Sequence, residues 1–290
     1  MPSQEIAYGT HEGNLDTLQG SLSCPWAIEP ARSSEIELIP NLNLIKKIKL
    51  GRTLDKLIYE AFATIFMSEI LKQYSDILRP NDFTLYSPEA VGFTYSSADG
   101  ESYTDWTSAL YQFFCPGVPL NKIENKKEKK FDIDGWKWKV RIGSRIAYLA
   151  GVLSEIFVNE GISHGDPQLR HIFMIPEHAE LRYLDDKGSQ IKVMSRNGLG
   201  VIDLEHCTLT GPYSSECLKD REILMEKLFE WFNYKSAQGF FENGRKVVKS
   251  RIGEYKASDL AYHMAMRKFA ERFDDIVERI DMENRAVYHK

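Results

Sequence analysis

The sequence predicts an α+β protein with two lobes, a small β-rich half followed by a larger helical half. Alternation of apolar and polar residues, which is typical of strands with one buried face, occurs mainly before position 117. After position 140 the apolar residues recur mainly at helical spacing. We therefore divide the 290 residues into an N-terminal arm (1–34), an N-lobe (35–117) and a C-lobe (118–290). The arm is rich in Gly, Ser and Pro, and we expect it to be poorly ordered or an irregular hairpin.

The composition is that of an ordinary globular protein, with 43% hydrophobic and 27% charged residues. A net charge of −5 gives no basic footprint for nucleic acid. The first residues lack a basic start and an apolar core, and no apolar helical run is long enough to cross a bilayer, so we expect a cytoplasmic protein without a membrane segment. The cysteines form no CxxC pair, which argues against a zinc knuckle or a disulfide framework.

Residues 42–50 alternate as a strand that ends at Gly51. This register places Lys46 on the apolar face beside Leu44 and Ile48, where a charge needs a partner or a phosphate. A register shifted by one residue would leave the lysines solvated, so the choice between Lys46 and Lys47 stays open.

The segment after Gly51 predicts a helix that starts near Thr53 and runs to about position 73. Its carboxylates Glu60 and Glu69 could each face the strand lysine. We prefer Glu69, and the choice between the two glutamates also stays open. Two antiparallel strands over 90–95 and 108–114 follow, and the Pro-Gly turn after them suggests a hinge between lobes.

In the C-lobe the pattern predicts a helix over 141–159, a short strand over 172–175, a buried strand over 198–202 that ends in Asp203, and further helices over 220–232 and 259–280. Between the first helix and the first strand lies GISHGDPQLRHIF, where Pro167 cannot continue a helix. This loop holds two histidines, a carboxylate and an arginine within eight residues. Loops on a rigid scaffold often carry catalytic groups, so Asp166 is the first candidate residue.

The order of these parts resembles the protein-kinase-like superfamily. The resemblance covers about 42–220 and is specific at His164-Gly165-Asp166 and at Val201-Ile202-Asp203-Leu204-Glu205. It is greatest to the atypical and small-molecule branch, which includes aminoglycoside phosphotransferases, lipopolysaccharide sugar kinases and RIO-type kinases.

This resemblance implies a two-lobed kinase-like fold and an ATP-dependent phosphotransferase that uses magnesium or manganese. It implies that Lys46, held by Glu69, contacts the nucleotide phosphates. It also implies that Asp166 positions or deprotonates the acceptor hydroxyl and that Asp203 binds the metal. Glu205 would be a second acidic group near that metal. The acceptor could be a small molecule or a protein hydroxyl, and neither it nor the oligomeric state is readable from the sequence.

Three features depart from the family pattern, two of them single residues and one a missing motif. His171 stands where an Asn usually binds the second metal, and imidazole suits manganese or zinc better than magnesium. Gln168 replaces the usual Lys or His, so Arg170 would neutralise the transferred phosphate. No GxGxxG precedes Lys46. In addition, Gly165 replaces the Arg of the HRD form, which argues against regulation by a phosphorylated activation loop.

Two other functions remain open from the sequence. One is a pseudokinase, a nucleotide-binding or protein-interaction module, which the missing glycine loop and His171 favour. The other is a metallohydrolase with a transition metal held by five ligands, namely His164, Asp166, His171, Asp203 and His206.

Overall fold

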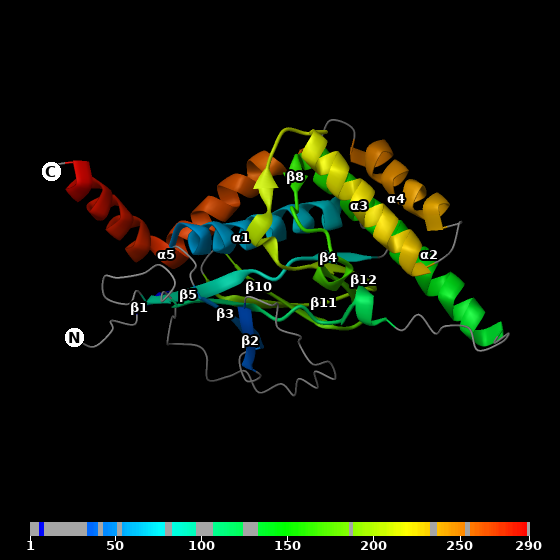
Figure 1. Cartoon of the computed structure of the whole chain (residues 1–290), viewed down its shortest axis with the longest axis horizontal. Coiled ribbons are helices and arrows are strands. Elements are labelled where there is room, and N and C mark those ends of the chain that lie inside the picture. Colours follow the sequence, from blue (N-terminus) through cyan, green and yellow to red (C-terminus); the bar gives the residue numbers. More distant parts are fainter. Residues whose placement is uncertain are drawn as a thin grey trace.

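The computed structural model describes residues 6–8, 34–39, 43–50, 54–78, 83–96, 107–123, 133–185, 188–232, 237–252 and 256–288. The predicted arm over 1–34 therefore lies outside the described residues, except for 6–8 and Ser34. The predicted α+β class is confirmed, with a five-stranded sheet before position 114 and a second part after position 133 that combines helices with shorter strands (Figure 1). The division into lobes at position 117 stays a prediction.

The N-terminal half is built on a five-stranded antiparallel sheet with the strand order β1-β5-β6-β3-β2. The expected pair of strands over 90–95 and 108–114 is confirmed as β5 and β6. The strands are β1 (Ile6–Tyr8), β2 (Ser34–Ile39), β3 (Leu44–Leu50), β5 (Ala90–Ser96) and β6 (Thr107–Phe113).

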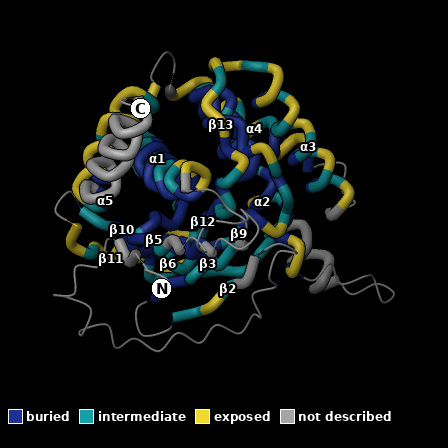
Figure 2. Tube along the Cα trace, turned by 60° about the vertical axis from the view of Figure 1, so that its left-hand side comes forward, coloured by how far each residue is buried: buried dark blue, intermediate teal, exposed yellow. Residues whose placement is uncertain are grey.

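Helix α1 (Leu54–Leu78) packs on this sheet and is buried on nearly every side. Residues 63–70 in its middle are all buried, including the polar Thr64, Ser68 and Glu69, so this part of the helix is enclosed by protein. Figure 2 shows α1 largely dark blue at the centre of the molecule. Because α1 contacts both halves of the chain, its position links the sheet to the helical half.

A four-stranded sheet with the order β4-β12-β9-β7 joins strands from both halves. Strand β12 runs parallel to β4 and antiparallel to β9. Short pairs flank this sheet, including a hairpin of β10 and β11. The strands are β4 (Thr84–Tyr86), β7 (Val118–Pro119), β8 (Ile162–Ser163), β9 (Ile172–Ile175), β10 (Glu180–Leu184), β11 (Gln190–Met194), β12 (Gly198–Val201) and β13 (Thr208–Leu209).

The helical half consists of α2 (Ile133–Glu160), α3 (Ser215–Phe232), α4 (Ala237–Ile252) and α5 (Ser258–Tyr288), with single 3₁₀ turns at Leu120–Lys122, Leu169–His171 and Leu204–His206. Helices α2 and α4 cross at two glycines, Gly151 and Gly244, where a Cβ atom would overlap a backbone carbonyl oxygen of the facing helix. Hence α2 and α4 approach more closely than larger residues would permit. No described helix is both long enough and apolar enough to span a membrane.

Helix α5 returns to the N-terminal half and packs along α1 (Figure 1). The N-terminus of α5 is capped by Glu160 at the end of α2, whose carboxylate accepts hydrogen bonds of 2.8 Å from the backbone N–H groups of Ala257 and Ser258. Glu160 also accepts a hydrogen bond from Tyr74 on α1. The buried Glu160 carboxylate of α2 thus contacts both α1 and the start of α5.

Further along α5, two buried cations reach the N-terminal half. Lys268 Nζ lies 2.6 Å from Glu69 Oε1 on α1, and Arg272 Nη2 lies 3.0 Å from Glu89 Oε2. Lys72 on α1 bridges both carboxylates, at 2.8 and 2.6 Å. Because each charge in this cluster is compensated, α1 is held against α5 along much of its length.

Gly244 provides a test of the close crossing of α2 and α4. Gly244→Ala would place a Cβ against the Tyr148 carbonyl, whereas Gly239→Ala on the same helix meets no atom within 4 Å. We expect Gly244→Ala to destabilise the fold by roughly 1–3 kcal/mol and Gly239→Ala to stabilise it by about 0.5–1 kcal/mol. Urea denaturation measures both values. Equal stability of the two variants would contradict the crossing described.

Glu89 makes the fold sensitive to acid. Burial opposes ionisation of this carboxyl, but Lys72, Arg272 and Lys268 outweigh that effect and lower its pKa from 4.5 to about 2. The stabilisation is therefore complete above pH 4.5 and is lost as the pH falls toward 2, a total of roughly 3 kcal/mol. Glu89→Gln should lower stability at pH 7 and flatten this acid limb.

The matched control for Glu89→Gln is Glu177→Gln, because Glu177 has a side chain that is 56% exposed. The free energy of unfolding, measured by denaturation at several pH values between 2 and 7, should change with pH in the same way in the control and in the wild type. An acid limb as steep in Glu89→Gln as in the wild type would show that Glu89 is not the titrating group.

Candidate functional site

The lysines of β3 lie on opposite faces of the strand, and the buried one is Lys47. Its Nζ atom is 3.1 Å from Glu60 Oε1, and Lys47 also forms an ion pair with Asp203. Lys46 points to the other face, where it meets Glu37 of the neighbouring strand β2 at 3.2 Å. The register expected from the sequence is thus corrected by one residue, because Glu60 of α1 lies on the face that carries Lys47, whereas Lys46 faces Glu37.

The partner of the buried lysine is Glu60, in the first half of α1. Glu69 lies nine residues further along the helix, which is about 13 Å, and it pairs instead with Lys268 and Lys72. The expected pair of Lys46 with Glu69 therefore does not form. A buried strand lysine nevertheless pairs with a carboxylate of the following helix. The two residues are Lys47 and Glu60, which are the alternatives that the sequence left open.

Asp203 follows β12, a strand buried at all four positions, as the sequence predicts. Its backbone is left-handed, with φ 63° and ψ 60°, which is uncommon for a residue other than glycine and is frequent at functional sites. Burial opposes ionisation, but the Lys47 ammonium group prevails and lowers the pKa of Asp203 to about 2. Conversely, the neighbouring carboxylates overcome the effect of burial and raise the pKa of Lys47 above its ordinary value.

Glu205, two residues beyond Asp203, faces the same group of lysines. Its carboxylate oxygens lie 2.6 and 2.8 Å from Lys49 Nζ and 3.4 Å from Lys47 Nζ. The sequence placed Glu205 near the metal but gave no role to Lys49, which shares a strand face with Lys47. Once the register is corrected, the alternation of β3 identifies Lys49 as a residue of this site.

Hydrogen bonds of His164 hold the backbone of the loop that follows α2. His164 donates from Nε2 to the Ile202 carbonyl at 3.1 Å and accepts at Nδ1 from the Asp166 N–H at 3.4 Å. Burial, and secondarily His171, lower the pKa of His164 and so favour this neutral form. Since the protein backbone uses both ring nitrogens, His164 positions the loop.

Asp220 on α3 is a second anchor, which the sequence analysis missed. It accepts hydrogen bonds from the Ser163 hydroxyl at 2.8 Å and from the Gly165 backbone N–H at 3.0 Å. Gly165 has φ +76°, and a Cβ there would overlap the His206 carbonyl oxygen. This contact explains why glycine stands at a position where the HRD form has an arginine. No local sequence signal distinguishes Asp220 from a surface acid.

His171 links the Asp166 loop to Asp203. His171 donates from Nδ1 to the Asp166 carbonyl at 3.0 Å and accepts at Nε2 from Arg170 Nε at 2.9 Å. The same Nε2 atom is 3.2 Å from Asp203 Oδ2. Arg170, with a side chain 57% exposed, also lies 3.6 Å from the Asp166 carboxylate. Buried His171 therefore stands between the two aspartates.

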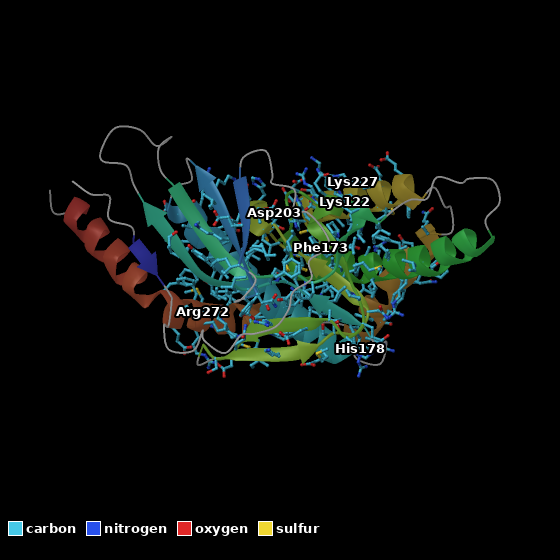
Figure 3. The ribbon with its side chains drawn as sticks, turned by 90° about the horizontal axis from the view of Figure 1, so that it is seen from below. Lys122, Phe173, His178, Asp203, Lys227 and Arg272 are labelled. Carbon is cyan, nitrogen blue, oxygen red and sulfur yellow. The ribbon has the colours of Figure 1, made fainter. Side chains whose placement is uncertain are left out.

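The described residues include one group of three acids that could hold a cation, made up of Glu60, Asp203 and Glu205. Oxygen atoms of these carboxylates lie within 4.8 Å of one another. Carboxylate oxygens are the ligands that Mg²⁺ and Mn²⁺ use in proteins, so the donor set fits a hard divalent cation. Figure 3 labels Asp203 of this group and, well apart from it, Arg272 on α5.

Gly165 offers a test of the packed loop. Gly165→Ala adds both a strained positive φ and a clash with His206, whereas Gly188→Ala has the same φ of +76° and meets nothing within 4 Å. We expect the cost in unfolding free energy to be greater at 165 than at 188 by roughly 1–3 kcal/mol. Chemical denaturation of both variants measures this difference. Equal costs would show that backbone strain alone explains the glycine.

Comparison with known proteins gave structural likenesses only. No protein-family model and no curated protein matches the sequence. Among solved structures, WaaP in complex with acyl carrier protein has 10% identity and a TM-score of 0.42 over 88% of this chain and 90% of that chain. The Rio2 kinase from Chaetomium thermophilum, in an ADP/Mg²⁺-phosphoaspartate complex, has 13% identity and a TM-score of 0.33 over 84% and 70%. At these values the likenesses assign no family, and the residues of the site carry the functional proposal.

Proposed function

We propose that this protein is a kinase-like phosphotransferase that uses ATP and a divalent cation to phosphorylate a hydroxyl group. The observation that carries the proposal is the meeting of three distant segments. Lys47 on β3 contacts both Glu60 on α1 and Asp203 after β12, and Asp203 faces the Asp166 loop through His171. A buried cation that pairs with two acids beside a loop carrying a further acid is a candidate functional site.

In phosphoryl transfer the main contributions of the protein are to position the reactants and to neutralise phosphate charge. Lys47 suits a phosphate contact because Glu60 and Asp203 keep its ammonium group charged and oriented. Since Glu60 lies on a helix buried on nearly every side, the orientation of Lys47 is fixed before any nucleotide binds.

Asp203 and Glu205 would hold the cation, and His171 would add a nitrogen ligand. Because Nδ1 donates to a carbonyl, the lone pair of His171 lies on Nε2 beside the Asp203 carboxylate, where it accepts from Arg170 Nε, and a bound cation would take the place of that hydrogen bond. When bound, a divalent cation supplies charge neutralisation for the nucleotide phosphates. A nitrogen ligand would favour manganese relative to an all-oxygen site.

Asp166 would orient the acceptor hydroxyl and take its proton. Its backbone is fixed by His164 and His171, while its carboxylate is partly exposed and so remains accessible to an acceptor. Arg170 would neutralise the transferred phosphate, since its guanidinium group lies next to this carboxylate and is largely exposed.

The metallohydrolase alternative has less support from the geometry. Backbone groups occupy both ring nitrogens of His164, and His206 lies beside Glu205 with a side chain that is 62% exposed. A pseudokinase would share the Lys47 cluster and would differ only in lacking transfer.

The decisive experiment measures nucleotide binding and γ-phosphate release with Mg²⁺ and with Mn²⁺. Asp203→Asn should abolish cation-dependent ATP binding, and Lys47→Met should weaken ATP binding at least tenfold. Asp166→Asn should bind ATP normally and lose transfer by roughly 10²–10⁴-fold. Lys46→Met, on the other face of the strand, is the matched control and should behave as the wild type.

A wild-type protein that binds no nucleotide with either cation would overturn the proposal. Binding without γ-phosphate release or autophosphorylation in the wild type would instead support the pseudokinase. Stoichiometric zinc or iron in the purified protein, together with no response to ATP, would favour the metallohydrolase.

A further inference from the structure

The face of β3 toward Asp203 carries an apolar residue followed by two lysines, Ile45, Lys47 and Lys49. Residues two apart on a strand share a face and are about 6.7 Å apart along it. The two ammonium groups therefore follow one another along a line, at a spacing that a polyphosphate chain can bridge. This inference rests on the proposed function and concerns how such a chain is held.

The positive charge of Lys47 is largely compensated by carboxylates of the protein itself. Two carboxylates, from Glu60 and Asp203, already compensate it, and Glu205 lies 3.4 Å away. In the described part of the chain the Lys49 ammonium group pairs with Glu205, and both of these side chains keep some exposure, 21% and 16%. Lys49 is thus the more available of the two cations for an incoming anion.

A second cation is required because the usual backbone cradle is missing from the sequence. Glycine-rich loops bind phosphates through successive N–H groups, and no GxGxxG precedes the β3 lysines in this chain. A nucleoside triphosphate with one compensated lysine would remain under-neutralised even beside a divalent cation. A further ammonium group on the same strand face meets this requirement.

We propose that Lys49 is a second nucleotide-phosphate ligand and that Glu205 forms an ion pair with the Lys49 ammonium group when no nucleotide is present. Glu205 is suited to this exchange because a carboxylate offers the same two-oxygen contact as a phosphate, at 2.6 and 2.8 Å. When phosphate displaces it, Glu205 becomes available to the cation that Asp203 binds. Nucleotide binding and completion of the cation site are then coupled through one side chain.

The pair of Lys46 with Glu37 provides the internal comparison. These residues are direct cross-strand neighbours on the opposite face of the sheet, and Glu37 is 49% exposed. Partly exposed ion pairs of that kind contribute little to stability. Lys49 and Glu205, in contrast, are 156 positions apart in the chain and are brought together beside Asp203.

The test measures the affinity of Lys49→Met for ATP, ADP and AMP by calorimetry in the presence of Mn²⁺ or Mg²⁺. We expect ATP affinity to fall roughly 10- to 100-fold, ADP affinity to fall less, and AMP affinity to stay unchanged. Lys49→Arg should retain most of the ATP affinity. Lys46→Met should match the wild type for all three nucleotides. Because a phosphate ligand responds to screening, the loss in Lys49→Met should shrink as salt rises.

Two outcomes overturn the inference while leaving the proposed function intact. One is a wild type that binds ATP together with a Lys49→Met protein that binds ATP equally well. The other is an equal loss of affinity for ATP, ADP and AMP, which would indicate a general structural effect. If Lys49→Met does not fold, as judged by thermal unfolding, Lys49→Gln is measured by the same criteria. If the wild type binds none of the nucleotides, the proposed function fails first.

Discussion

The site depends on one buried ammonium group, that of Lys47. Two charges in the interior are stable only when their mutual attraction and hydrogen bonds replace the water that they lose. Lys47 meets this condition through Glu60 and Asp203, which come from a helix and from the end of a strand in the other half of the chain. Displacing any one of the three elements would leave a buried charge uncompensated, so this cluster restricts how β3, α1 and β12 can be arranged.

Helix α1 is the element that makes this arrangement rigid. Its first half carries Glu60 to Lys47, and its second half carries Glu69 and Lys72 into the charge cluster that receives Lys268 from α5. The cap that Glu160 forms on α5 fixes the start of that helix against α2. The C-terminal helix thus supports the helix that carries Glu60.

The loop of Asp166 is organised on different principles. Neutral His164, the Asp220 carboxylate and a glycine with positive φ hold its backbone through hydrogen bonds and close packing rather than through charge. The groups that remain partly exposed, the Asp166 and Arg170 side chains, are those to which the proposal gives contact with the reactants. A fixed backbone with accessible side chains is the arrangement that positional catalysis requires.

The sequence by itself determined the α+β class, the β5–β6 pair, the buried strand that ends in Asp203 and the loop at Asp166. These features depend on local patterns, such as alternation, helical spacing and the effect of proline, which are set by neighbouring residues. Only the tertiary structure decided that Lys47 rather than Lys46 is buried, because the register of a strand with apolar residues on both faces depends on what covers each face. It alone paired Glu69 with Lys268 and brought Lys49 to Glu205, because these contacts join residues 199 and 156 positions apart, and no local pattern encodes such pairings.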